Sequence, residues 1–260
     1  MTHPAVSSTQ GRVVGAIARA ASRTGVDFDY LMDQARVESG MRPDARADTS
    51  SATGLYQFTK QTWFGTVKQH GAAHGLGWAT GAIAKSGNGN WTVADPDMRA
   101  AILDLRTNPE AAAAMAAEFA ADNGEFLQSR IGGNIEPVDL YLAHFLGAEG
   151  AGRFLGAMKD DPEQPAAPLF PAAASANRAI FYRDDGSARS LSDIRSDFAR
   201  KLGSAPSRMP LPARHAHSIG SRSTATPGTP PGMAQMEPMP GRLDLDFARN
   251  AYRRLSGLPT

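Results

Sequence analysis

Helix start signals recur along this chain and constrain its fold more than any other feature. A helix N-terminus favours a Ser, Thr, Asp or Asn cap, a proline at the first helical position and an acid in the first turn. Asp95-Pro96-Asp97 and Asn108-Pro109-Glu110 carry all three signals, while Asp27, Thr59 and Ser190 are each followed by apolar residues at helical spacing. Alternating patterns typical of strands are scarce. The sequence therefore predicts a mainly α fold.

The predicted helices run from these starts to the next glycine or proline. We expect helices over 10–24, from Asp27 to before Gly40, over 59–69, from residue 95, from residue 108, over 137–146 and 149–158, and from residue 190. Residues 71–95 are rich in glycine and receive no assignment, apart from a turn at GNGN, residues 87–90. The loop 41–58 has room for short β elements.

Composition divides the chain into three parts. Residues 8–203 carry the helical patterns and form the predicted domain. Residues 204–241 hold eight of the 18 prolines among Ser, Thr, Gly and Met, and bury too little apolar area to offset their ordering entropy. This segment is predicted to be a disordered linker. Residues 242–258 regain an amphipathic pattern, which predicts a short C-terminal helix.

The bulk composition excludes several kinds of function. A net charge of +1 gives no overall field that would favour nucleic acid. The absence of cysteine excludes thiol nucleophiles, disulfides and cysteine-ligated zinc. No apolar run approaches the roughly 18 residues of a membrane span. The N-terminal apolar stretch is short and runs into Arg19, so no signal peptide is recognised.

The helix that begins after Asp27 carries a glutamate on its apolar side. Leu31, Ala35 and Glu38 lie at i, i+4 and i+7, so Glu38 is expected to project toward the core. Burial and the negative end of the helix dipole both disfavour a charged carboxylate there. A protonated carboxyl is what a glycosidic leaving oxygen needs from a general acid. This segment alone, however, favours the alternative that Glu38 turns to solvent at a frayed helix end.

A second motif, GLYQF at 54–58, follows a polar loop. Gly54 allows close backbone approach, and the Gln57 amide offers both a donor and an acceptor. Amides and aromatic rings together suit N-acetyl sugars, because the amide pairs with acetamido and hydroxyl groups while the ring covers the apolar sugar face. In isolation, the motif would be a buried turn with a structural glutamine.

Residues 38–63, ESGMRPDARADTSSATGLYQFTKQTW, resemble the catalytic core of the soluble lytic transglycosylases, in the superfamily that includes goose-type lysozyme. The family pattern is a Glu-Ser pair closing a helix, a polar loop, Gly-Leu-x-Gln and a following helix. The resemblance implies a mainly α, lysozyme-like fold with Glu38 as the catalytic residue. It assigns substrate binding to Ser39, Gly54, Leu55, Tyr56 and Gln57.

A later family motif, Ala-Tyr-Asn-Ala-Gly, is similar to AHFLG at 143–147. His144 replaces the tyrosine and Phe145 the asparagine. His144 is interpreted either as a substrate-binding cleft residue or as a satisfied core histidine. Tyr141, one helical turn earlier, is a second candidate for substrate binding through its hydroxyl. For the third family motif, residues around 106–118 are the best candidates.

The resemblance implies that one carboxylate cleaves peptidoglycan, although most glycosidases use two. In this family the glutamate protonates the oxygen between N-acetylmuramic acid and N-acetylglucosamine. It then deprotonates the muramoyl 6-hydroxyl, which closes a 1,6-anhydro ring, and no metal or cofactor is required. If Asp48 held a water, the enzyme would be an inverting muramidase. The altered AHFLG motif supports a third alternative, a non-catalytic peptidoglycan-binding or assembly protein.

The expected partner is the peptidoglycan glycan strand, which implies the periplasm or cell envelope by an export route that the sequence leaves open. Service to an envelope machine such as a flagellum, pilus or secretion system is also expected. The C-terminal helix is expected to dock onto a protein partner or back onto the enzyme.

Two other groups of residues receive weaker assignments. His70 and His74 have metal-pair spacing but no acid beside them in the sequence, so no metal site is predicted. Trp63, Trp78 and Trp91 are assigned to core packing in preference to a glycan cleft.

Overall fold

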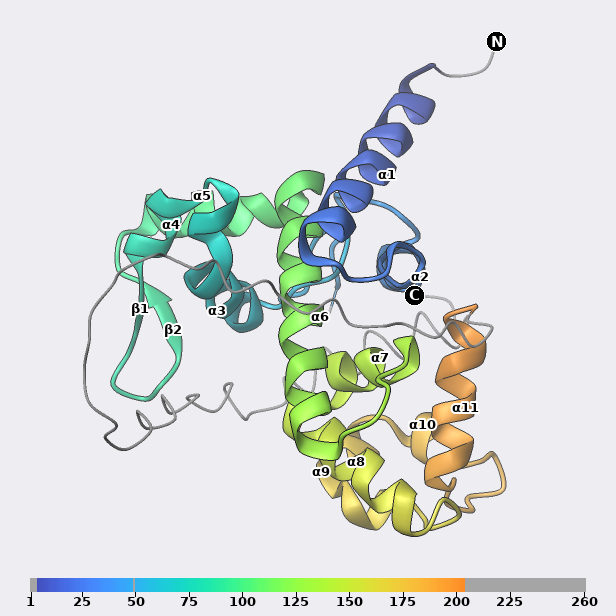
Figure 1. The fold of residues 1–260 in the computed structure, drawn as a ribbon. Helices are drawn as coiled ribbons and strands as arrows, with labels where there is room; N and C mark the ends of the chain where they lie inside the picture. The colour runs from blue at the N-terminus through green and yellow to red at the C-terminus, as the bar shows by residue number, and fades with distance from the viewer. Residues whose placement is uncertain (1–3, 49, 204–260) are drawn as a thin grey trace, which may run out of the picture.

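The computed structural model describes residues 4–48 and 50–203, with side chains from residue 9 (Figure 1). The predicted linker at 204–241 and the predicted helix at 242–258 lie outside these residues. The α-helices and strands are α1 (Pro4–Thr24), α2 (Phe28–Ser39), α3 (Lys60–His70), α4 (Gly77–Ala82), β1 (Ile83–Lys85), β2 (Trp91–Val93), α5 (Pro96–Asp104), α6 (Pro109–Ile131), α7 (Pro137–Leu146), α8 (Ala148–Asp160), α9 (Pro171–Ala176), α10 (Arg178–Phe181) and α11 (Leu191–Lys201). Short 3₁₀ helices are η1 (Gly71–His74), η2 (Leu105–Thr107) and η3 (Ala167–Leu169). The mainly α fold is confirmed.

The five cap residues read from the sequence all act as caps. The side chains of Asp27, Thr59, Asp95, Asn108 and Ser190 each accept a hydrogen bond from a backbone N–H in the first turn of the following helix. These bonds satisfy donors that a helix cannot pair internally. These five helix starts were therefore predictable from local chemistry.

The long helix α6 runs through the centre of the molecule (Figure 1). Helices α1 and α2 lie toward one end of it, α3 to α5 and the hairpin lie on one side, and α7 to α11 gather at the other end. Alanines line much of the buried surface of α6, which allows close packing with α1. They include Ala112, Ala113, Ala116, Ala117 and Ala120.

The strands lie outside the loop that was expected to hold them. Ile83–Lys85 pairs antiparallel with Trp91–Val93, across a turn that contains the GNGN segment. The loop 41–58 holds only isolated bridges in the described residues, between Arg46 and Thr53 and between Thr53 and Phe58. Strands of three residues are too short to show a clear alternating pattern.

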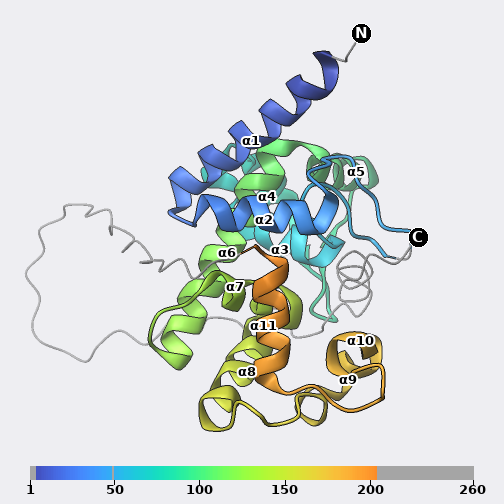
Figure 2. The ribbon, with the colours of Figure 1, turned by 90° about the vertical axis from the view of Figure 1, so that its right-hand side faces the viewer.

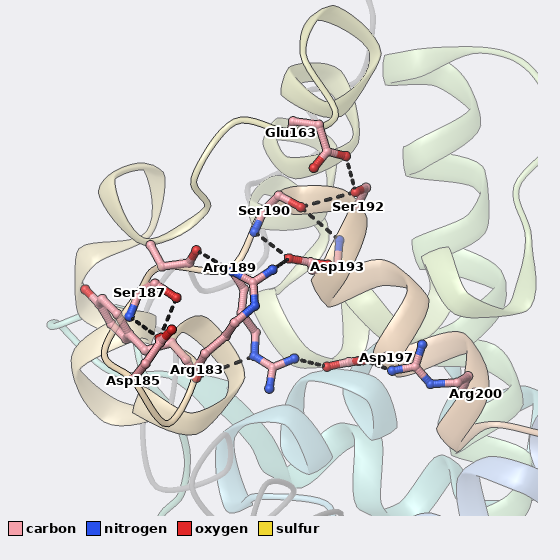
Figure 3. Close-up of polar contacts among 12 residues, drawn as sticks. Glu163, Arg183, Asp185, Ser187, Arg189, Ser190, Ser192, Asp193, Asp197 and Arg200 are labelled. Atoms are coloured by element: carbon pink, nitrogen blue, oxygen red, sulfur yellow. Dashed lines mark hydrogen bonds and ion pairs between the residues drawn. The ribbon is translucent and has the colours of Figure 1, made fainter.

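Helix α11 packs against α7 (Figure 2), and the side chain of Arg195 links the two helices. Arg195 donates from Nε to Asp139 at 2.8 Å and from Nη2 to Glu136 at 2.7 Å, and these two acids cap the start of α7. Figure 3 shows a second set of contacts at the start of α11, where Asp193 completes a capping box with Ser190. Helix α11 is thus anchored at its N-terminal half.

Across the described ranges, no helix has both the length and the apolar character needed to cross a membrane.

Candidate active site

Glu38 lies in the last turn of α2, and both ends of this helix are capped. Asp27 caps the start, and Gly40 ends the helix in the left-handed conformation with φ of 60°. Only 1% of Glu38 is exposed. The predicted core-facing position is confirmed, and the alternative that the side chain turns to solvent is wrong.

Ser39 joins the end of α2 to the second motif. Its Oγ lies 2.8 Å from the carbonyl oxygen of Leu55 and 3.0 Å from that of Ala35, and it accepts a hydrogen bond from the Arg42 N–H. The hydroxyl thus connects two segments that are 16 residues apart in the sequence. The position of Glu38 therefore depends on the loop 54–57.

That loop is a tight, buried turn. Gly54 has φ of +87° and Gln57 has φ of +51°, both in the left-handed region. The Gly54 N–H donates to Ala45 O at 2.7 Å, and Gln57 Nε2 donates to Ala45 O and Gly54 O at 3.1 and 2.8 Å. The Tyr56 hydroxyl donates to Leu31 O of α2 at 3.1 Å. These bonds go to backbone, so they shape the loop.

Arg106, in η2, donates hydrogen bonds to the backbone on both sides of this loop. Its guanidinium is buried and donates from Nη1 to Ser51 O at 2.6 Å and to Phe58 O at 3.1 Å, and from Nε to Leu103 O. Burial, with a further contribution from Arg46, lowers the pKa of Arg106 to about 10, so the guanidinium stays charged at neutral pH. Arg106 lies at the edge of the region 106–118 selected for the third motif, but sequence reasoning assigned it no role.

Helix α7 brings two side chains to Glu38. The Tyr141 hydroxyl lies 3.5 Å from Glu38 Oε1, and His144 Nε2 lies 3.3 Å from the same oxygen. Residues three apart share one helix face, so both reach the carboxyl together. The Phe198 ring of α11 packs edge-on against Tyr141, with ring centroids 5.3 Å apart. His144 of the AHFLG motif and Tyr141, one helical turn before it, therefore both lie against the carboxyl of Glu38.

Tyr30, also on α2, is a buried phenol whose pKa is affected by the neighbouring Glu38 carboxyl. Burial, and then the neighbouring Glu38, raise the pKa of the Tyr30 phenol far above its usual value. The phenol therefore stays neutral over the working pH range. Asp48 is exposed in the polar loop, and its role in holding a water stays a prediction.

His70 and His74 do have acidic neighbours, supplied by α6. His70 lies 2.6 Å from Asp122 and 3.3 Å from Glu118, and His74 lies 2.8 Å from Glu118. The sequence showed no adjacent acid because these acids lie 44 to 52 residues further along the chain. In the described part of the chain, no group of three or more His, Cys, Asp or Glu residues is arranged to hold a metal ion.

The tryptophans divide between core and surface. Trp63 is fully buried and donates from Nε1 to Ile102 O at 2.7 Å, as expected for core packing. Core packing is wrong for Trp78, which is 47% exposed on α4. Trp91 is half-buried beneath the Lys85 ammonium.

The described residues form a helical domain in which a buried glutamate lies at a helix end, and the next residue, a serine, bonds to a tight Gly-Leu-x-Gln turn. The comparison with known families agrees, because residues 15–75 match the family model described as the transglycosylase SLT domain. This match confirms the resemblance noted in the sequence, over the segment that holds both motifs. The match supports the lytic transglycosylase family and peptidoglycan as the substrate. It includes Glu38, Ser39 and the loop 54–57 but ends before α7.

Proposed function

We propose that this protein is a peptidoglycan lytic transglycosylase in which Glu38 acts first as acid and then as base. It cleaves the β-1,4 bond between N-acetylmuramic acid and N-acetylglucosamine and leaves a 1,6-anhydro end. The observation that carries the proposal is the burial of Glu38 at the end of α2, facing α7, within the segment that matches the SLT domain.

The chemistry follows from one carboxyl group in a dry site. Glu38 gives its proton to the glycosidic oxygen as the C1–O4 bond breaks. The resulting carboxylate takes the proton of the muramoyl 6-hydroxyl as O6 bonds to C1. The exclusion of water favours ring closure over hydrolysis and strengthens each electrostatic contact in the site. Because Glu38 is 1% exposed, substrate entry requires neighbouring side chains to move.

The residues proposed to bind the substrate fall into two groups. Tyr141 and His144 lie beside the reacting carboxyl, where they would meet the sugar next to the scissile bond. Ser39 and the loop residues Gly54, Leu55, Tyr56 and Gln57 are proposed to form the wall that the substrate packs against.

Product analysis of digested sacculi tests the proposal. Purified sacculi are digested with the wild-type protein in ¹⁸O-labelled water, and the muropeptides are analysed by mass spectrometry. Unlabelled products lighter by one water than the reducing ends support transglycosylation. A Glu38→Gln variant should release nothing, while a Glu163→Gln variant at an exposed position after α8 should match the wild type.

Two other results would replace the proposal. Labelled reducing ends that disappear in an Asp48→Asn variant would indicate a muramidase with Asp48 holding the water. No release by the wild type, equal to Glu38→Gln, would indicate a non-catalytic peptidoglycan-binding or assembly protein.

The setting proposed for this activity follows from the substrate. A peptidoglycan enzyme acts in the cell envelope or periplasm, where it would open the wall for turnover or for an envelope machine. We propose that residues 8–203 form the catalytic domain, and that 242–258 dock onto a protein partner beyond the linker 204–241.

A further inference from the structure

His144 stands where the family pattern has a tyrosine, and it lies against the Glu38 carboxyl. Its Nε2 lies 3.3 Å from Glu38 Oε1, and the two side chains are 7% and 1% exposed. A carboxylate removed from water to this degree needs a positive charge or hydrogen-bond donors in place of its lost hydration. Tyrosine supplies a donor only, whereas an imidazole is able to supply a donor and a positive charge.

The His144 ring is oriented by two aromatic neighbours. It stacks on Tyr141, with ring centroids 5.9 Å apart at 30°, and Phe119 of α6 meets it edge-on at 6.3 Å and 77°. Rings packed in this way have little freedom to rotate. The direction in which Nε2 points is therefore set by packing.

The other polar side chains near Glu38 cannot supply a positive charge. Tyr30 of α2 and Tyr141 of α7 are phenols, which cannot supply a positive charge. The Ser39 hydroxyl is directed to backbone carbonyls. His144 is thus suited to compensate a negative charge on Glu38.

We propose that His144 is a positioning residue for Glu38, which holds Oε1 and compensates the carboxylate charge that exists between the two steps of the reaction. The inference rests on the proposed function of Glu38. In the first step the C1–O4 bond breaks and the proton passes from Glu38 to O4. In the second, the O6–C1 bond forms and the 6-hydroxyl proton returns to Glu38.

Three substitutions separate this role from packing. His144→Phe keeps a ring between Tyr141 and Phe119 but removes both nitrogens. His144→Gln places an amide nitrogen near the position of Nε2, and His144→Asn places it nearer to that of Nδ1. We expect kcat on soluble glycan to fall about 10²-fold in the Phe and Asn variants, with KM within about twofold. The Gln variant should recover only part of this loss, because its amide donates a hydrogen bond but carries no positive charge. A Phe variant with wild-type kcat, or equal losses in all three variants with lowered Tm, would overturn the role.

A spectroscopic measurement tests the contact without activity. The chain has six histidines, and the His144 ring signals in a ¹⁵N spectrum are assigned by their loss in His144→Gln. Glu38→Gln should shift those ring signals and leave those of His70 and His74 unchanged. Unchanged His144 signals with an active wild type would overturn the inference alone. A wild type that releases no glycan would overturn the proposed function, and with it the catalytic meaning of the pair.

Discussion

Gly54 is the left-handed glycine in the site where a substitution by alanine should lower the free energy of unfolding most. An added Cβ would lie 1.8 Å from the carbonyl oxygen of Arg106, and real Cβ contacts stay beyond 3.0 Å, so loop and η2 must separate by about 1.2 Å. The left-handed φ costs an alanine about 1–2 kcal/mol. Overpacking adds about 1–3 kcal/mol. We therefore expect a loss of about 2–5 kcal/mol in the free energy of unfolding.

Gly75→Ala is the matched control. Gly75 has nearly the same φ, +76°, but nothing lies within 4 Å of its added Cβ, so only the conformational cost of about 1–2 kcal/mol applies. Urea unfolding of both variants, with the slope m checked for constancy, gives the difference. Because typical domains have about 5–15 kcal/mol of stability, both variants should fold.

The activity of the two variants should also differ. A displaced loop moves Leu55 O, which lies 2.8 Å from Ser39 Oγ beside Glu38. Gly54→Ala should therefore lose turnover of sacculi out of proportion to its loss of stability, while Gly75→Ala should not. Equal losses of stability in the two variants would refute the close-approach argument.

Three further outcomes are expected. Arg106→Met leaves three backbone carbonyls without their guanidinium donor, so it should cost about 2 kcal/mol in urea unfolding and lower turnover, and Arg106→Lys should not restore either, since an ammonium lacks the forked geometry. Arg195→Met leaves the buried Asp139 carboxylate without its ion-pair partner and should lower the free energy of unfolding by about 1–3 kcal/mol. Arg19→Met breaks the exposed pair with Glu110 and should lower it by under about 1 kcal/mol. Truncation after residue 203 should leave cleavage of soluble glycan unchanged, and loss of that activity would place the following residues in the catalytic fold.

The parts of the fold that the sequence predicted depend on local chemistry. A cap side chain bonds to an N–H two or three residues away, so Asp27, Thr59 and Ser190 could be recognised without knowledge of the fold. Glu38 was found in the same way, because a polar residue interrupts an apolar stripe. The three-residue strands around residues 86–90 were missed because such short segments carry no period.

The parts that were missed depend on long-range contacts. Arg106 acts on carbonyls 48 and 55 residues earlier in the chain. Glu118 and Asp122 reach the histidines of α3 and η1 only because α6 packs beside them. A single sequence holds no period or spacing that reveals such pairs. The motif likeness did place His144 near the site, but it could not show that Nε2 faces Glu38.

Different parts of the chain position the two halves of the site, α2 with the loop 54–57 on one side of Glu38 and α7 on the other. Glu38, Ser39 and the loop 54–57 lie inside the SLT match and are held by caps and by Arg106. Helix α7, which departs from the family pattern, is held by α11 through Arg195 and Phe198, and both lie outside the match. A Phe198→Leu variant should therefore change the contacts of Tyr141 and leave those of Ser39 unchanged. The SLT match includes Glu38 and its neighbour Tyr30, whereas the other two side chains against the carboxyl, Tyr141 and His144, come from α7 outside the match.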